Sequence, residues 1–341
     1  MPDAPGGGGR LARLAAVASH WARRVTVGLH ESWARRVTVG LRESWARRVT
    51  AGLHAGAHSR AGRAIAAPIR EGQRRVRTWG RNARLIAADL ASSLPHWRDW
   101  TADYRYLTRS RLRASVRRTR RRVRLLLAPL TPRGTALDWA PPAPGADPGE
   151  PRDVVVLPGI YETPADLSPL TDHLRRAGHR VHTVRGLGRQ LLPMPLLRHR
   201  VEAMLADTDL RDVVLLAHSK GGLIGKQVLM GPQGARVARL VAIATPWHGS
   251  RYAALFWPGL GVRSLTPGSA LISAAEAPHP SDARIVSIAP AFDPHVPLGS
   301  ALEGAHTIHV AATGHFAVLG DPRVIELVGT LVAQAPSGKA T

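Results

Sequence analysis

Ser219 lies where an aliphatic run meets a turn of small residues, and this setting predicts a reactive hydroxyl. Val213 to Leu216 is followed directly by Ala217-His218-Ser219-Lys220-Gly221-Gly222. As strand, sharp turn and helix, this pattern holds the serine in a strained backbone conformation, so the residues two positions away must be small. The hydroxyl then lies beside the amides of a helix N-terminus, which stabilise developing negative charge. The alternative is a strand-to-helix turn without chemistry.

A serine hydroxyl needs a base, and the base needs an orienting carboxylate. Two strand-like segments downstream of Ser219 lead into suitable residues. Residues 284–288 lead into Phe292-Asp293-Pro294-His295, and residues 307–311 lead into Gly314-His315-Phe316. Each segment therefore presents a candidate at its carboxyl end.

Residues 153–323 resemble an α/β-hydrolase of the lipase and esterase kind. Four stretches carry the resemblance: Leu157-Pro158-Gly159-Ile160-Tyr161, Ala217 to Gly222, Ala244 to Ser250, and the pair of segments around Asp293 and His315. One position departs from the usual Gly-x-Ser-x-Gly pattern, because Ala217 stands where glycine is usual. The resemblance implies a serine hydrolase that needs no cofactor and no metal.

The family order of serine, acid and histidine assigns Asp293 as the orienting acid and His315 as the general base. The competing residues fit less well. His295 lies on the acid's own loop, His309 falls inside a strand as a packed core residue would, and His218 is expected to pack under the turn; Asp282 precedes its strand, and Asp321 comes too late. The resemblance further implies an oxyanion hole made of the backbone amides of Ile160 and Lys220.

Alternating aliphatic runs and helical spacings predict an α/β fold with a doubly wound, mostly parallel sheet. The expected strands are 153–157, 181–184, 213–216, 240–244, 284–288 and 307–311, and the expected helices are 164–177, 196–207 and 223–230. Chemistry in such sheets gathers at the carboxyl ends of the strands, where the motifs above fall.

The charge of the chain is concentrated in its N-terminal part. Of the 47 Lys and Arg residues, 29 lie in residues 1–140, all of them Arg, against eight acidic residues there. The chain has no cysteine, which excludes disulfides, a cysteine nucleophile and thiolate metal sites. No apolar run reaches the ~18 residues that a membrane span requires.

The sequence divides into an Arg-rich extension, largely helical or disordered, and a catalytic domain. Residues 1–59 hold a tandem repeat of twelve residues, residues 60–137 read as basic helices (63–77, 81–92 and 97–127), residues 138–152 form a Pro/Gly-rich linker, and residues 153–335 form the hydrolase domain. Arginine with interspersed tryptophan in residues 10–130 fits an anionic membrane surface as partner. A disordered basic arm without a dedicated partner fits the same pattern equally well. Nucleic acid is disfavoured because no base-reading motif accompanies the charge.

The resulting hypothesis is hydrolysis of carboxylic esters, with an ester or lipid as substrate, through an acyl-enzyme on Ser219. Two alternatives stay open: acyl transfer to another acceptor, and a non-catalytic scaffold whose basic extension binds membrane or nucleic acid. The expected location is the cytoplasm, peripheral to a membrane. Secretion is left open because Leu11 to Ala18 is apolar, but a signal peptide is not favoured because Arg13 interrupts that stretch.

Overall fold

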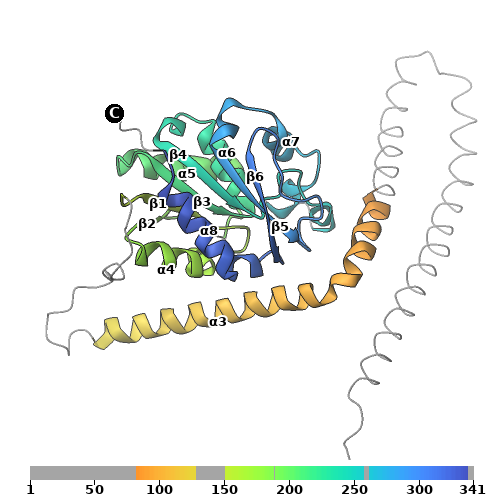
Figure 1. Ribbon diagram of the computed structural model, residues 1–341, viewed down its shortest axis with the longest axis horizontal. Helices are drawn as coiled ribbons and strands as arrows, with labels where there is room; N and C mark the ends of the chain where they lie inside the picture. The colour runs from red at the N-terminus through yellow and green to blue at the C-terminus, as the bar shows by residue number, and fades with distance from the viewer. Residues whose placement is uncertain (1–81, 128–149, 188, 257–260, 337–341) are drawn as a thin grey trace, which may run out of the picture. The chain divides into compact units, whose positions relative to one another are not determined.

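A six-stranded parallel sheet forms the centre of the computed structural model, which describes residues 82–127, 150–187, 189–256 and 261–336 (Figure 1). The strands are β1 (Asp153–Leu157), β2 (Arg180–Thr183), β3 (Val213–His218), β4 (Val237–Ile243), β5 (Ile285–Phe292) and β6 (His306–Thr313). Their order is β2-β1-β3-β4-β5-β6, and every neighbouring pair is parallel. All six predicted strands are present, and the predicted doubly wound sheet is confirmed.

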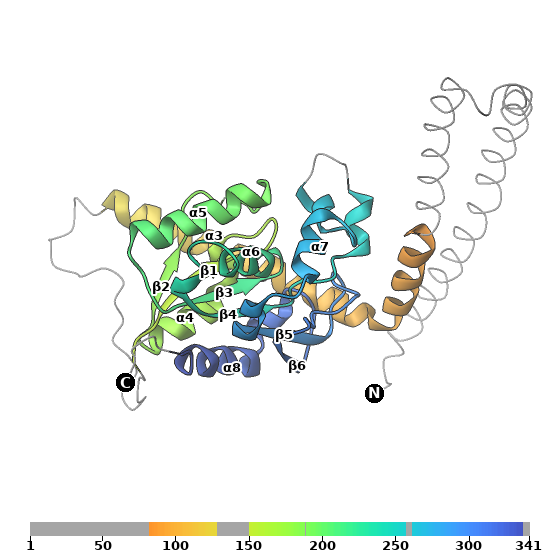
Figure 2. The ribbon, with the colours of Figure 1, turned by 90° about the horizontal axis from the view of Figure 1, so that it is seen from above.

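Helices cover both faces of the sheet (Figure 2). α4 (Ser168–Arg176) and α8 (Pro322–Ala333) pack on one face, while α5 (Met194–Asp207) and α6 (Lys220–Leu229) pack on the other. Strand residues alternate between the two apolar cores because successive side chains point to opposite faces. In β1, Val154 and Val156 belong to the core under α4 and α8, whereas Val155 and Leu157 belong to the core under α5 and α6. Burial on both faces explains the continuous aliphatic strands.

Shorter elements connect these layers. They are η3 (Pro164–Leu167), η4 (Gly234–Arg236), η5 (Arg251–Leu255), η6 (Gly261–Leu265), α7 (Ala270–Glu276), η7 (Pro280–Arg284) and η8 (Ala317–Gly320). The sequence predicted one helix over residues 164–177, and the chain instead forms η3 and then α4 there. Pro169 sits in the first turn of α4, where its missing amide hydrogen costs nothing.

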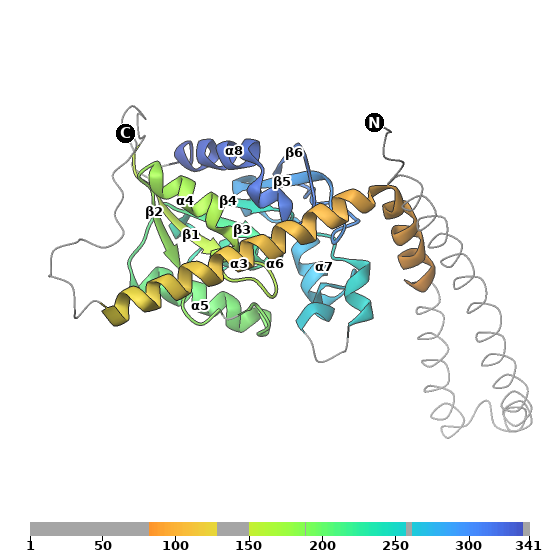
Figure 3. The ribbon, with the colours of Figure 1, turned by 90° about the horizontal axis from the view of Figure 1, so that it is seen from below.

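A long helix of the N-terminal extension packs against the sheet domain. Residues 82–93 are helical, η1 (Leu94–His96) follows, and α3 runs over Trp97–Leu127, as the spacing predicted. α3 contacts η3 and η8, and the described residues form one compact unit (Figure 3). The predicted helix over 63–77, the tandem repeat and most of the predicted linker lie outside the described residues. No helix within the described ranges is both long and apolar enough to cross a membrane.

Candidate active site

Ser219 occupies the turn between β3 and α6. Its backbone has φ 52° and ψ −125°, a conformation that residues with a Cβ rarely adopt, and its amide donates to the carbonyl of Ile243 at 2.9 Å. Such strain persists only where the surrounding structure imposes it, and it gathers at functional sites. The turn predicted from the small residues around this serine is present.

Two glycines let α6 begin close to the sheet. A Cβ on Gly221 would come within 2.0 Å of the carbonyl oxygen of Leu157 in β1, and one on Gly222 within 2.1 Å of Oγ1 of Thr245. Both separations are too short for any side chain. The glycines therefore hold Ser219 at the edge of the sheet and the first amides of α6 beside it.

Ser219, His315 and Asp293 form one chain of hydrogen bonds. Nε2 of His315 lies 3.0 Å from Oγ of Ser219, and Nδ1 of the same ring lies 2.7 Å from Oδ2 of Asp293. The second oxygen of Asp293 accepts from the amides of His295 at 2.8 Å and Val296 at 3.0 Å, which fixes the carboxylate. All three side chains are largely buried. The structure thus brings together the three residues that the sequence selected from strands far apart in the chain.

Burial and charge act in opposite directions on this pair. Burial alone would raise the pKa of Asp293, but the His315 imidazolium and its hydrogen bond hold that pKa below its usual value. Burial alone would lower the pKa of His315, but Asp293 and then Glu162 raise it above its usual value. Asp293 therefore stays ionised and stabilises a proton on His315, which suits a base that gains and returns a proton.

The positions of these residues in the sheet decide the fold family. Six parallel strands carry a strained serine after the third, an acid after the fifth and a histidine after the sixth. The fold is that of the α/β-hydrolases. In this fold the residue after the nucleophile and the loop after an earlier strand supply the oxyanion donors, so the amide of Lys220 and one from the loop after β1 stay the predicted donors here.

Several solved α/β-hydrolase structures are similar to this chain. Bacillus licheniformis lipase BlEst2 in mature form shares 16% identity at a TM-score of 0.44, covering 55% of this chain and 95% of that one. A metagenomic carboxyl esterase shares 17% identity at a TM-score of 0.40, covering 58% and 78%. An extracellular α/β-hydrolase from Paenibacillus shares 15% identity at a TM-score of 0.39, covering 55% and 100%. Neither a protein-family model nor a curated protein matches the chain.

The loop after β1 lies against the serine. A Cβ on Gly159 would come within 2.8 Å of the Cβ of Ser219. In this loop the Gly159 amide donates to Oε2 of Glu162 at 2.5 Å, and the Tyr161 amide donates to the carbonyl of Arg189 at 2.8 Å. Within the described residues, the Ile160 amide between them has no such partner. The geometry is consistent with Ile160 as an oxyanion donor, and that role stays a prediction.

Lys220 begins α6, so its amide has no carbonyl partner within the helix. Its side chain, which the sequence argument did not consider, is buried and donates from Nζ to the carbonyl of Gln190 at 2.6 Å. Burial lowers the pKa of Lys220 to about 8. The side chain thus ties α6 to the segment before α5.

A buried pair, Glu162 and His218, lies beneath the site, and sequence reasoning missed its carboxylate. The Nδ1 atom of His218 lies 2.8 Å and 2.9 Å from the two carboxylate oxygens of Glu162, and its Nε2 lies 2.9 Å from the carbonyl of His315. Burial alone would raise the pKa of Glu162, but His218 and the Gly159 amide hold it below its usual value. Both nitrogens of His218 face acceptors, which favours an imidazolium paired with a carboxylate. His218 packs under the turn as predicted.

His295 does not reach the serine. It lies over α3, with Nε2 3.1 Å from the hydroxyl of Tyr104 and its ring centroid 5.5 Å from that of Trp100. Burial lowers the pKa of His295 to about 4, so it stays neutral at physiological pH. The ligand atoms of Asp293, His295 and His315 lie within 4.8 Å of one another. The first and last of these already bond to each other, which accounts for their proximity without an ion.

The other competing residues serve the fold. Asp282 pairs with the buried Lys226 at 2.9 Å, and Asp321 accepts from the Arg323 amide at the start of α8. His309 was expected in the core, and this expectation is wrong: β6 is an edge strand, and His309 is exposed on it. The strand-like sequence of residues 307–311 located the strand but gave no indication of its place at the edge of the sheet.

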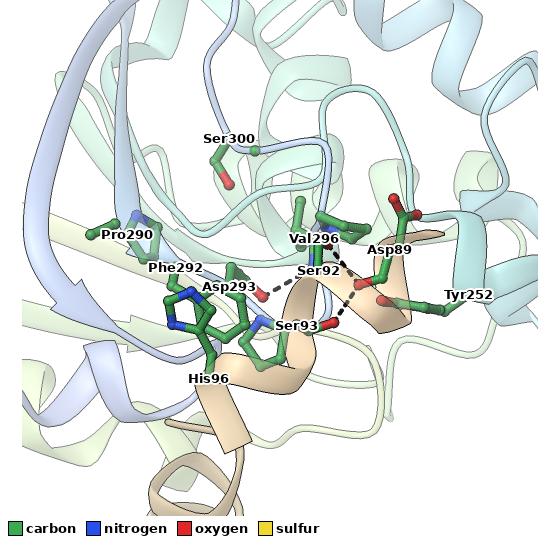
Figure 4. A pocket seen from close by; sticks show the side chains of 14 residues that line it. Asp89, Ser92, Ser93, His96, Tyr252, Pro290, Phe292, Asp293, Val296 and Ser300 are labelled. Carbon is green, nitrogen blue, oxygen red and sulfur yellow. Dashed lines mark hydrogen bonds between the residues drawn. The ribbon is translucent and has the colours of Figure 1, made fainter. Parts of the chain in front are cut away.

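A cavity of about 250 Å³ lies behind the acid loop, between the 82–93 helix and the segment that follows β5 (Figure 4). Asp89, Ser93, His96, Tyr252 and Asp293 are among the residues that line it. Neither Ser219 nor His315 lines it, so it does not open onto the reacting atoms. It shows instead that helical residues of the extension form part of the surroundings of Asp293.

Proposed function

We propose that this protein is a serine hydrolase that cleaves carboxylic esters through an acyl-enzyme on Ser219. The supporting observation is the hydrogen-bond chain from Ser219 through His315 to Asp293, with distances of 3.0 Å and 2.7 Å. A nucleophile, a base within reach of it and a carboxylate that orients the base are the parts that acyl transfer requires. Similar solved structures include esterases and a lipase, and they indicate the fold alone.

In the proposed reaction, Oγ of Ser219 attacks the ester carbonyl while Nε2 of His315 takes the hydroxyl proton. The tetrahedral oxyanion accepts hydrogen bonds from the amides of Ile160 and Lys220, each of which stabilises it by roughly 3 kcal/mol. The intermediate collapses, the bond to the leaving alkoxide breaks, and His315 returns its proton to that oxygen. Water, deprotonated by the same histidine, then attacks the acyl carbon. The bond to Oγ of Ser219 breaks, His315 returns the proton to that oxygen, and the carboxylic acid is released.

The proposed substrate class is esters, with lipid esters as its narrower form. Colour release from p-nitrophenyl esters of increasing acyl length measures the chain preference. An optimum at long chains supports the lipid form, and cleavage of short chains alone contradicts it. Ester product formed in the presence of an added alcohol would place the activity with acyl transfer instead.

The direct test is labelling by a fluorophosphonate probe, which reacts with activated serines. The wild-type chain should be labelled, and Ser219→Ala should not. Ser110→Ala is a suitable control, because the Ser110 hydroxyl is buried in α3 and, among the described residues, its hydrogen bond goes to the backbone carbonyl of Leu107. Loss of labelling in S110A, or persistent labelling in S219A, would refute the assignment of Ser219.

The proposed second partner is an anionic membrane surface, bound through residues 10–130. In α3, eleven of 31 residues are arginine, which suits phosphate head groups. Co-sedimentation with vesicles containing phosphatidylserine should occur and weaken with salt, whereas neutral vesicles should not retain the protein. Binding to DNA of matched charge and not to vesicles would contradict this proposal. The cytoplasmic, membrane-peripheral location stays a prediction that depends on the same result.

A further inference from the structure

α3 carries two acidic residues among its 31, and both bond to residues within two positions of His315 in the chain. Oδ1 of Asp99 accepts from the hydroxyl of Thr313 at 2.9 Å. One turn later, Oδ1 of Asp103 accepts from the amides of Phe316 at 2.6 Å and Ala317 at 2.7 Å. These two amides follow His315 directly in the chain. A carboxylate from the N-terminal extension is therefore bound to the backbone that carries the proposed base.

Asp103 is enclosed by that backbone. Its side chain has no exposed surface, and a Cβ on Gly314 would come within 2.6 Å of its Oδ1. Gly314 has φ +94°, which lets the chain turn around the carboxylate without a side chain in the way. A buried carboxylate is costly unless it is hydrogen-bonded, and the two amides supply those bonds. The position of Asp103 and the path of residues 314–317 therefore depend on each other.

The helical segment from η1 into α3 also touches the end of β5 and the loop after it, which carries the acid. The ring of His96 stacks on Phe292, with centroids 4.1 Å apart and planes at 16°. The rings of Trp100 and Tyr104 lie 5.5 Å and 5.7 Å from that of His295. The N-terminal helical segment thus contacts the acid loop through aromatic rings and the base loop through hydrogen bonds.

We propose that Asp103 is a positioning residue that holds His315 in line with Ser219, so that the N-terminal helix is part of the active centre. This inference rests on the function proposed above. The position of the His315 ring depends on the position of its backbone. The next two amides along that backbone, those of Phe316 and Ala317, donate to the carboxylate of Asp103. Without these bonds the loop loses the anchor beside the base, and a shift of about 1 Å in a reacting group costs about 10²-fold in rate.

Three full-length variants separate hydrogen bonding from charge. Asp103→Asn keeps an oxygen with two lone pairs at the same place and removes the charge. Asp103→Glu keeps the charge and moves the carboxylate by one methylene, and Asp103→Ala removes the acceptor. Asp282→Ala is the matched control, because Asp282 is also a buried carboxylate but lies before the amino end of β5, opposite the site. Each variant is checked for folding by circular dichroism and thermal unfolding.

The readout is the rate of fluorophosphonate labelling, with kcat and KM on a cleaved p-nitrophenyl ester. We expect D103A to label about 10²-fold more slowly, with kcat reduced and KM little changed. D103N should stay near the wild type, D103E should be slower than D103N, and D282A should melt earlier and label at the wild-type rate. The order of D103N and D103E decides the proposal even if D103A does not fold.

Three results would overturn the inference. Faster labelling of D103E than of D103N would show that the charge of the carboxylate acts. Labelling of all three variants at the wild-type rate would show that the carboxylate holds nothing in place. D282A slowed as much as D103A would show a general effect of lost stability. An unlabelled wild-type chain would instead overturn the proposed function itself, and the inference with it.

Discussion

Substitution of Glu162 tests the buried network beneath the site. Glu162 is nearly inaccessible and holds the Gly159 amide at 2.5 Å and the His218 ring at 2.8 Å. Glu162→Ala leaves the imidazolium and one amide without partners. Removing one member of a buried ion pair costs about 3–5 kcal/mol of unfolding free energy. For a domain of this size, that corresponds to a fall in Tm of roughly 6–20 °C.

Glu162→Gln supplies the matched control. The glutamine oxygen can accept from the Gly159 amide, and its amide nitrogen can donate to a neutral His218 ring, so all the hydrogen bonds survive. We expect E162Q to lose about 1 kcal/mol, because the surviving hydrogen bonds are no longer charge-assisted. Urea unfolding at neutral pH measures both differences. E162A as stable as the wild type, or no more destabilised than E162Q, would refute the assignment of a buried ion pair.

The buried ion pair also predicts how the stability of the protein changes with pH. The pKa of Glu162 is lowered in the folded protein, so the stability from its carboxylate is fully present above the unfolded pKa of about 4.3 and is lost as pH falls through the lower folded value. E162Q should therefore show a shallower acid decline than the wild type. An identical acid decline in the two proteins would count against the assignment.

Three further predictions concern the base, the turn and the extension. Asp293→Asn should lower kcat by about 10⁴-fold, and because Asp293 raises the pKa of His315, the acid limb of the pH–rate profile should move to lower pH; an unmoved limb would contradict this. Gly221→Ala should lower the unfolding free energy by about 3 kcal/mol, because the new Cβ would clash with the carbonyl oxygen of Leu157. Unchanged urea unfolding would refute this close approach. Removal of residues 1–81 should leave fluorophosphonate labelling intact, whereas removal through the end of α3 should abolish it, and equal labelling of both truncations would contradict the role given to α3.

The sequence predicted the sheet and the three residues of the hydrogen-bond chain because both depend on local pattern. A buried parallel strand reads as an aliphatic run, and the turn at Ser219 needs small residues on both sides. The strands that precede them marked Asp293 and His315 as candidates, and the resemblance to the α/β-hydrolase order of serine, acid and histidine then assigned their roles. These features are encoded over a few neighbouring residues each.

Features that depend on packing could not be predicted in the same way. Nothing near Glu162 indicates that it meets His218, 56 residues away, since that contact exists only once β1 and β3 pair. Asp103 gave a faint signal as one of two acids in an arginine-rich helix, at a spacing of four that puts both on one face. Its partners after β6 are 213 and 214 residues distant in the chain and could be found only from the fold.

The central claim is a covalent acyl group on Ser219, and the most direct measurement is the mass of that adduct. The protein is mixed with a p-nitrophenyl ester, quenched in acid within the first turnover and digested for mass spectrometry. The account predicts one acyl group on the peptide that contains Ser219, and none in Ser219→Ala or in a protein quenched after the ester is exhausted. Ester cleavage that continues in S219A at the wild-type rate, with no acyl group on this peptide, would contradict it.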